Sequence, residues 1–175
     1  WAWTLRVDAI TGIVSHFAGG GDQRLTQNST VPAENLLIHT SNGGWIHHLN
    51  TPGMATDQAG NLFVFDTGKQ EHQENGTPHI PASIIKVDNN GTASLVVGGG
   101  ADANASTWIG KQGTDLQLPY GWVGDFTVDN SGNVFISMAG SAWVFRVDAK
   151  TGIVSKISGG GDQRLTQNST VPAEN

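Results

Sequence analysis

Asparagine side chains carry the most frequent chemical pattern in this chain. The tripeptide N-x-S/T, in which x is not proline, is the acceptor of N-linked glycans. It occurs at Asn28, Asn75, Asn90, Asn104 and Asn168. Residues 36–175 hold four of these sites, where average composition would give about one. All fall in predicted turns or loops, so we expect glycosylation and passage through a secretory or surface-assembly pathway. The alternative is that Asn and Thr are simply common in turns.

The histidines do not form a metal-binding pattern. The six are His16, His39, His47, His48, His72 and His79. None are spaced as H-x-H or H-E-x-x-H, and the adjacent pair at 47 and 48 would point to opposite faces of a strand. The chain has no cysteine, which excludes thiolate ligands and disulfides. We therefore expect neither a metal nor another cofactor.

Three runs of glycine, at 19–21, 98–100 and 159–161, resemble parts of phosphate-binding loops. Such a loop requires a following G-K-S/T and a helix that begins there, and the sequence predicts neither. The pattern G-x-S-x-G of a nucleophilic serine is also missing. We expect the glycines to provide flexible passage between groups of strands, and the chain not to be an enzyme. The six tryptophans fit packing better than a sugar-binding surface.

Composition narrows the class of protein. The 175 residues carry a net charge of −6, with no basic excess for a nucleic-acid partner. No apolar run approaches the roughly 18 residues of a membrane span. Twenty-four glycines beside 37% hydrophobic residues favour many turns between short strands. With neither an initiator methionine nor a signal peptide, both ends are expected to be internal to a longer precursor.

A long internal repeat sets the organisation of the chain. Residues 1–35 align on 141–175 with an offset of 140, and 28 of the 35 positions are identical. The last 17, GGGDQRLTQNSTVPAEN, match without a break. Such identity indicates duplication within a tandem array, with an artificial duplication as the alternative. A weaker repeat relates 54–68 to 125–140 and 83–100 to 143–161, so each 140-residue unit contains two modules of about 70 residues.

We predict that each module contains four strands joined by turns of the type D-x-x-G or D-x-x-x-G. Asp accepts hydrogen bonds from its own turn and Gly supplies positive φ at the end of it. The intervening segments are rich in β-branched and aromatic residues. We predict strands at 53–57, 61–66, 83–88, 92–98, 124–129, 133–138, 143–148 and 152–158. Residues 3–8 and 12–18 would be the last two strands of a preceding module, and we expect this half-module to be unstable unless another copy supplies the missing strands.

The modules resemble the NHL-repeat β-propeller family. The resemblance lies in LNTPGMATDQAGNLFVFDTG followed by SIIKVDNNGTASLVVGGG, and in LQLPYGWVGDFTVDNSGNVFIS followed by VFRVDAKTGIVSKISGGG. It covers most of residues 1–21, 49–100 and 116–161. It implies an all-β fold of β-propeller-type, four-stranded antiparallel blades in a tandem array. Some members bind zinc through histidines at a central channel, but no histidine here matches those positions.

These observations predict three segments. Residues 1–35 end a preceding unit, 36–100 form one NHL-like blade with long loops, and 101–175 form a second blade with a connecting loop. We expect a structural, non-enzymatic extracellular or cell-surface protein, a glycosylated fibre or surface assembly whose partners are further copies of itself. The alternative is a closed six-bladed secreted propeller that binds a protein or glycan. A metal-dependent propeller lyase or hydrolase is the third interpretation.

Overall fold

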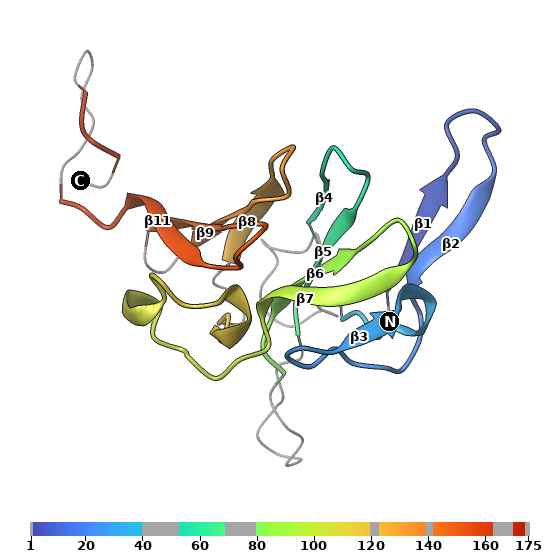
Figure 1. Cartoon of the computed structure of the whole chain (residues 1–175), viewed down its shortest axis with the longest axis horizontal. Coiled ribbons are helices and arrows are strands. Elements are labelled where there is room, and N and C mark those ends of the chain that lie inside the picture. The colour runs from blue at the N-terminus through green and yellow to red at the C-terminus, as the bar shows by residue number, and fades with distance from the viewer. Residues whose placement is uncertain are drawn as a thin grey trace, which may run out of the picture.

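A computed structural model describes residues 2–39, 53–68, 80–119, 123–138, 142–162 and 170–173. Over these residues the chain contains eleven strands, three short 3-10 turns and no α-helix, so the predicted all-β class is confirmed there. The strands form three antiparallel sheets that follow one another in chain order along the long axis (Figure 1). The three sheets do not close into a ring.

The first sheet is a hairpin of β1 (Trp3–Val7) and β2 (Val14–Gly19), close to the predicted strands. Its other edge, along β1, has no partner strand within the described residues. The hairpin is present without further strands, and our expectation that this half-module is unstable unless another copy supplies them stays a prediction. The ladder with β2 is local in sequence, and Ala18 packs beside Leu36 and Ile38, which together hold the hairpin in place.

The central sheet has five strands in the order β3-β7-β6-β5-β4. They are β3 (Thr30–Pro32), β4 (Met54–Thr56), β5 (Leu62–Asp66), β6 (Ser83–Val87) and β7 (Thr92–Gly98). Four of them match the predicted module. The fifth, β3, was expected to be loop and instead pairs with β7, with Val31 opposite Ala93. Its Pro32 lies at the outer edge of the sheet, where a missing backbone donor is tolerated.

The third sheet is the four-stranded antiparallel module that the sequence predicts, in the order β11-β10-β9-β8. Its strands are β8 (Val123–Val128), β9 (Val134–Met138), β10 (Trp143–Val147) and β11 (Val154–Gly159). The hairpins β1–β2, β6–β7 and β10–β11 share one register, including an irregularity after their second paired residue. The internal repeats of the sequence are therefore repeats of backbone structure.

Aspartates organise the tight turns, which explains the recurring D-x-x-G-N sequence. Asp57 Oδ1 accepts the Asn61 backbone N–H at 2.9 Å, and its Oδ2 accepts the Asn61 side-chain amide at 2.7 Å. Asp129 holds Asn133 in the same way, at 2.9 and 2.7 Å. These two-point contacts fix the start of the following strand, so the motif is a structural feature of each module.

Two apolar clusters join the sheets. The larger lies between the central and third sheets and includes Phe63, Ile84, Phe145 and Val147. Trp108, which is 1% exposed, belongs to it and comes from the connection between the two modules. The smaller cluster joins the first hairpin, the segment around β3 and the central sheet. Neighbouring sheets thus share a core, which is what stacked blades require.

The glycine runs allow the backbone to approach itself closely. Gly21 donates to Leu36 O at 3.2 Å, and Gly100 donates to Leu116 O at 3.0 Å. A Cβ at Gly21 would collide with the backbone of Asn35, and one at Gly100 with that of Asp115. After these two runs the chain therefore turns back to bring a 3-10 turn, η1 (Ala33–Asn35) or η3 (Gly113–Asp115), beside the glycines. A structural requirement for glycine is sufficient to explain these positions.

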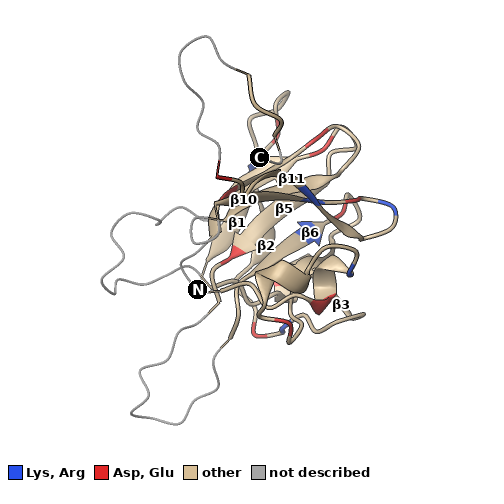
Figure 2. Cartoon of the chain, turned by 90° about the vertical axis from the view of Figure 1, so that its left-hand side faces the viewer, with Lys and Arg blue, Asp and Glu red and all other residues tan. Residues whose placement is uncertain are grey.

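Charged residues are dispersed along the described chain in Figure 2, with acidic residues mainly on turns and loops. Within the described part of the chain, no helix is long and apolar enough to cross a membrane.

Candidate functional site

The turn aspartates are acidic because their own turns stabilise the carboxylate. Hydrogen bonds from the backbone N–H groups of Thr151 and Lys150 lower the pKa of Asp148 to about 2, with further contributions from the Thr151 hydroxyl and from Arg146. The pKa of Asp8, in the equivalent turn, is also lowered, first by the Thr11 backbone N–H. These groups remain ionised near neutral pH and hold turns.

A third carboxylate with a lowered pKa lies in the connection between modules. The Lys111 ammonium, 2.6 Å from Asp102 Oδ2, is the main cause, and the Thr107 hydroxyl adds to it. Backbone donation from Asn104 contributes less. The carboxylate thus joins the two ends of a short loop around η2 (Ala105–Thr107), which makes a structural role sufficient to explain it.

Three of the five predicted glycosylation sites lie in the described residues, and all three side chains are exposed. Asn28 has a positive φ of 63° in the loop before β3. Asn90 lies in the turn between β6 and β7, as predicted. Asn104 precedes η2, and its Oδ1 accepts the Ser106 hydroxyl at 2.8 Å. Asn75 and Asn168 lie outside the described residues.

The predicted packing role of tryptophan fits Trp108 and Trp143, which lie around the third sheet, better than Trp3. Trp108 and Phe145 have ring centroids 5.4 Å apart, and Trp143 packs against the same phenylalanine at 5.5 Å. Trp3 is 69% exposed and contacts His16 at 5.6 Å. Within the described residues, no group of three or more His, Asp or Glu is arranged to hold a metal ion. His47, His48, His72 and His79 lie outside that part of the chain.

The hairpins of the two repeat copies have the same register but opposite burial. Val7 is 62% exposed in β1, and its counterpart Val147 is 1% exposed in β10. Leu5 is 58% exposed, whereas Phe145 is 1% exposed. Val14 and Val154 differ in the same sense. The apolar face of the first hairpin, which we call the open face and define by Leu5, Val7 and Val14, therefore lies in solvent.

The second hairpin shows what covers such a face. Strand β9 pairs along β10, with Ile136 opposite Phe145 and Val134 opposite Val147. The connection between the modules covers the other edge, where Lys111 O accepts the Val154 N–H at 2.9 Å. Trp108 from that connection packs on Phe145. None of the described residues takes these places around β1 and β2.

The segments that follow the two hairpins also differ in burial, but here the segment of the first copy is the more buried one. In the first copy, Val31 is 6% exposed and Ala33 is 2% exposed, because β3 pairs with β7 and Ala33 donates to Gly91 O at 2.7 Å. In the second copy, Val171 is half-buried and Ala173 is exposed. Residues 170–173 form no strand, and Ala173 O accepts the Gly159 N–H at 2.8 Å. One sequence thus has two environments.

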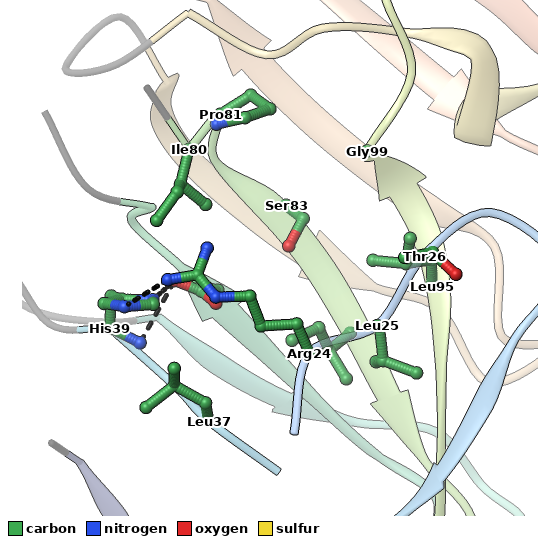
Figure 3. Close-up of a pocket in the computed structure, with 12 residues that line it drawn as sticks. Arg24, Leu25, Thr26, Leu37, His39, Ile80, Pro81, Ser83, Leu95 and Gly99 are labelled. Carbon is green, nitrogen blue, oxygen red and sulfur yellow. Dashed lines mark hydrogen bonds and ion pairs between the residues drawn. The ribbon is translucent and has the colours of Figure 1, made fainter. Parts of the chain in front are cut away.

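A pocket of about 170 Å³ lies where the first copy of the repeat meets the central sheet (Figure 3). Arg24 and His39 line it from the segment around β3. Asp66 and Ser83, paired at the ends of β5 and β6, line it from the sheet, and each is 7% exposed. The remaining wall is mostly aliphatic: Leu25, Leu37, Ile80, Pro81, Ile85 and Leu95.

A series of contacts links the polar side chains that line the pocket. An Arg24 Nη2 lies 3.2 Å from His39 Nε2, and because the guanidinium is always a donor, Nε2 accepts and the ring proton belongs on Nδ1. Nδ1 lies 3.5 Å from Asp66 Oδ1, is buried and has no hydrogen-bond partner in the described residues. Asp66 Oδ1 also accepts the backbone N–H groups of Gly68 at 2.8 Å and His39 at 3.1 Å.

No pattern noted in the sequence predicted this pocket. Asp66 begins D-T-G and resembles the turn aspartates, but here it is the buried last residue of a strand. The signal that would have found it is internal: the third sheet has Met138 and Trp143 where the central sheet has Asp66 and Ser83. The two modules therefore differ in chemistry at one shared position of the fold.

A scan against models of protein families finds no match, and a search of curated proteins finds no significantly similar sequence.

Proposed function

We propose that this chain is part of a structural, non-enzymatic extracellular or cell-surface protein in which 140-residue, NHL-like units follow one another head to tail. The observation that carries the proposal is the opposite burial of the two repeat copies. The second copy has its hairpin covered, and the first has its following segment paired in a sheet. A repeat copy that lies between two complete units would have both a covered hairpin and a following segment paired in a sheet.

The energetic argument concerns the apolar surface of the open face. Burial of such surface stabilises by roughly 25 cal/mol per Å². Leu5, Val7 and Val14 would each gain the environment that Phe145, Val147 and Val154 already have. The occupant to which we assign the open face is another repeat unit, through residues equivalent to 108–138, either covalently continuous or docked as a separate copy. The free edge of β1 would receive a strand equivalent to β9 in the same step.

Glycosylation fits this assignment, because Asn28, Asn90 and Asn104 are exposed on loops and turns rather than within strands. We expect intact-glycopeptide mass spectrometry of the native protein to find glycans on most of the five sites, including Asn75 and Asn168. Unmodified asparagine at all five would remove the support for a glycosylated extracellular protein.

Electron microscopy of the native protein tests the arrangement of the units. Continuous filaments, or strings of regularly spaced units, are the expected result. Discrete closed rings about 50 Å across would instead favour the six-bladed propeller made of three units, a size typical of a compact domain of that length. Isolated particles of a single unit would contradict both arrangements.

A further inference from the structure

We propose that the pocket between the first repeat copy and the central sheet binds a small zwitterion, namely an α-amino acid with an aliphatic side chain. This inference does not depend on the succession of units, because both sides of the pocket are present in one chain. It starts from the comparison of the two modules. A carboxylate and a hydroxyl, each 7% exposed, stand in the central sheet where the third sheet has Met138 and Trp143.

A structural role explains only part of this polar group. Asp66 Oδ1 accepts two backbone N–H groups and so fixes the chain at His39 and Gly68. The Asp66 side chain is nearly buried and also lines the pocket. The third sheet has the same strand ending with methionine, so the fold does not require a carboxylate there. A cationic group of a ligand in the pocket would add a further, charged partner to this carboxylate.

The charges of the pocket select the ligand class. Arg24 extends across the pocket towards His39 in Figure 3, and a guanidinium has five N–H donors, of which the contact with His39 uses one. Asp66 supplies the opposite charge on the same pocket. A simple anion would be repelled by the carboxylate and a simple cation by the guanidinium. A zwitterion satisfies both, with its carboxylate on Arg24 and its ammonium on Asp66.

Size and wall chemistry restrict the ligand further. A volume of about 170 Å³ is below the roughly 300–1,000 Å³ of pockets for drug-sized ligands. At about 30 Å³ for each water it corresponds to about six waters, so a ligand of fewer than about ten heavy atoms fits. Leu37, Ile85 and Leu95 offer an aliphatic wall, and among the described residues no Trp, Tyr or Phe lines the pocket to stack on a sugar. Valine and leucine combine the required charges, size and apolar side chain.

The site would occur once in each 140-residue unit. It forms where the segment after a hairpin pairs with the outer strand of the next sheet, as β3 pairs with β7. Residues lining it come from both sides of that junction, so a bound ligand would hold the junction together. The third sheet has Ala103 at the place of Arg24, three residues after the corresponding glycine run and beside the equivalent strand bridge, so its junction lacks the guanidinium.

Binding of L-leucine to the chain, followed by NMR chemical shifts of backbone amides, tests the proposal. We expect saturable shifts at Arg24, His39, Asp66 and Ser83 with one site per chain. The single-charge analogues 4-methylvalerate and isoamylamine should bind about tenfold more weakly or worse, since each lacks one charge-assisted hydrogen-bonding group. Glucose should produce no shifts at these residues.

Two substitutions test the Arg24 guanidinium and the Asp66 carboxylate separately. Arg24→Ala introduces the residue that the third sheet has, and should weaken L-leucine binding by about tenfold. Asp66→Asn keeps an oxygen that accepts the backbone N–H groups and removes the charge for the ammonium, with a similar expected loss. Arg6→Ala, at an exposed arginine on β1, is the matched control and should leave binding unchanged. Thermal unfolding of each variant monitors the fold.

Several results would overturn the assignment. Absence of L-leucine shifts at the pocket in the unmodified chain would do so, as would equal binding of the two single-charge analogues. Glucose binding at the same residues would replace the zwitterion by a polyol. If Asp66→Asn fails to fold, Arg24→Ala on the exposed side of the pocket remains decisive, because unchanged affinity in that variant contradicts the role of the guanidinium.

Discussion

The two copies of the 35-residue repeat are nearly identical in sequence and complementary in structure. In the first copy the hairpin is exposed, and the following segment is a buried strand of the central sheet. In the second copy the apolar face of the hairpin is buried in the third sheet, and residues 170–173 of the following segment form no strand. Sequence alone therefore does not decide which residues are buried. Each copy lacks the neighbour that the other one has.

The backbone structure of the hairpin differs less between the two copies than the burial of its side chains does. Both hairpins have Trp opposite Gly, Arg opposite Ser and Val opposite Val, with the same interruption near the Trp end. The turns also agree, since Asp8 and Asp148 accept the same three donors from the residues that follow. Local sequence fixes the hairpin, and the neighbouring sheet decides whether its apolar face is covered.

Truncation of the aromatic position in each hairpin should give the largest difference between the copies. Phe145→Ala removes a buried ring from the larger core and should reduce the free energy of unfolding by about 3–5 kcal/mol. Leu5→Ala at the equivalent exposed position should change it by no more than about 0.5 kcal/mol. Urea unfolding measures both values, and similar losses in the two variants would contradict the difference in burial.

The segments after the hairpins should show a smaller difference with the opposite sign. Val31→Ala removes buried methyl groups from β3 and should cost about 1–2 kcal/mol. Val171→Ala changes the same residue in the second copy and should cost less than about 0.5 kcal/mol. The substitution is chemically identical in the two variants, so a difference between them reports environment. An equal cost would mean that residues 170–173 are packed as tightly as β3.

The equivalent turns should show the smallest difference, in their response to pH. The pKa of Asp148 is lowered to about 2 in the folded chain, below its ordinary value of 3.8. The carboxylate therefore stabilises the fold above about pH 4, and this contribution is lost as the pH falls towards 2. The stability difference between Asp148→Asn and the unmodified chain should shrink over that interval.

Carboxyl NMR titration supplies the comparison with the first copy. Asp8 should also titrate below 3.8, because the Thr11 backbone N–H and hydroxyl donate to it. Only in the second copy does an arginine contact the turn carboxylate directly, with Arg146 Nη2 2.7 Å from Asp148 Oδ2. An Asp148 pKa near 3.8 would show that these hydrogen bonds do not hold the turn.

The sequence was sufficient where structure depends on local chemistry. The D-x-x-G-N and D-x-x-x-G turns and the β-branched runs located ten strands to within about two residues at their ends. Those turns are closed by contacts between residues two to four positions apart, such as Asp129 with Asn133. Such contacts are visible in a linear pattern.

The features that the sequence did not predict depend on contacts between distant segments. Strand β3 is a three-residue segment that becomes a strand because β7 presents a free edge to it. Asp66 resembles a turn residue in the sequence, but in the fold the backbone of His39 donates to it. Arg24 contacts His39 from the segment that leads into β3, which pairs with β7. The pairing of β3 does not follow from local pattern, because residues 170–172 have the same sequence and form no strand.

Thiol labelling tests the complementarity of the two copies most directly, because the chain has no cysteine of its own. A single Val171→Cys chain should react rapidly, and a single Val31→Cys chain slowly, in line with their exposure. The decisive comparison places Val171→Cys in an extended chain, in which residues 36–175 are repeated after Asn175. We predict that labelling at position 171 then slows to the rate of Val31→Cys, because the segment gains a β7 to pair with. Equally rapid labelling of position 171 in both chains would contradict the account.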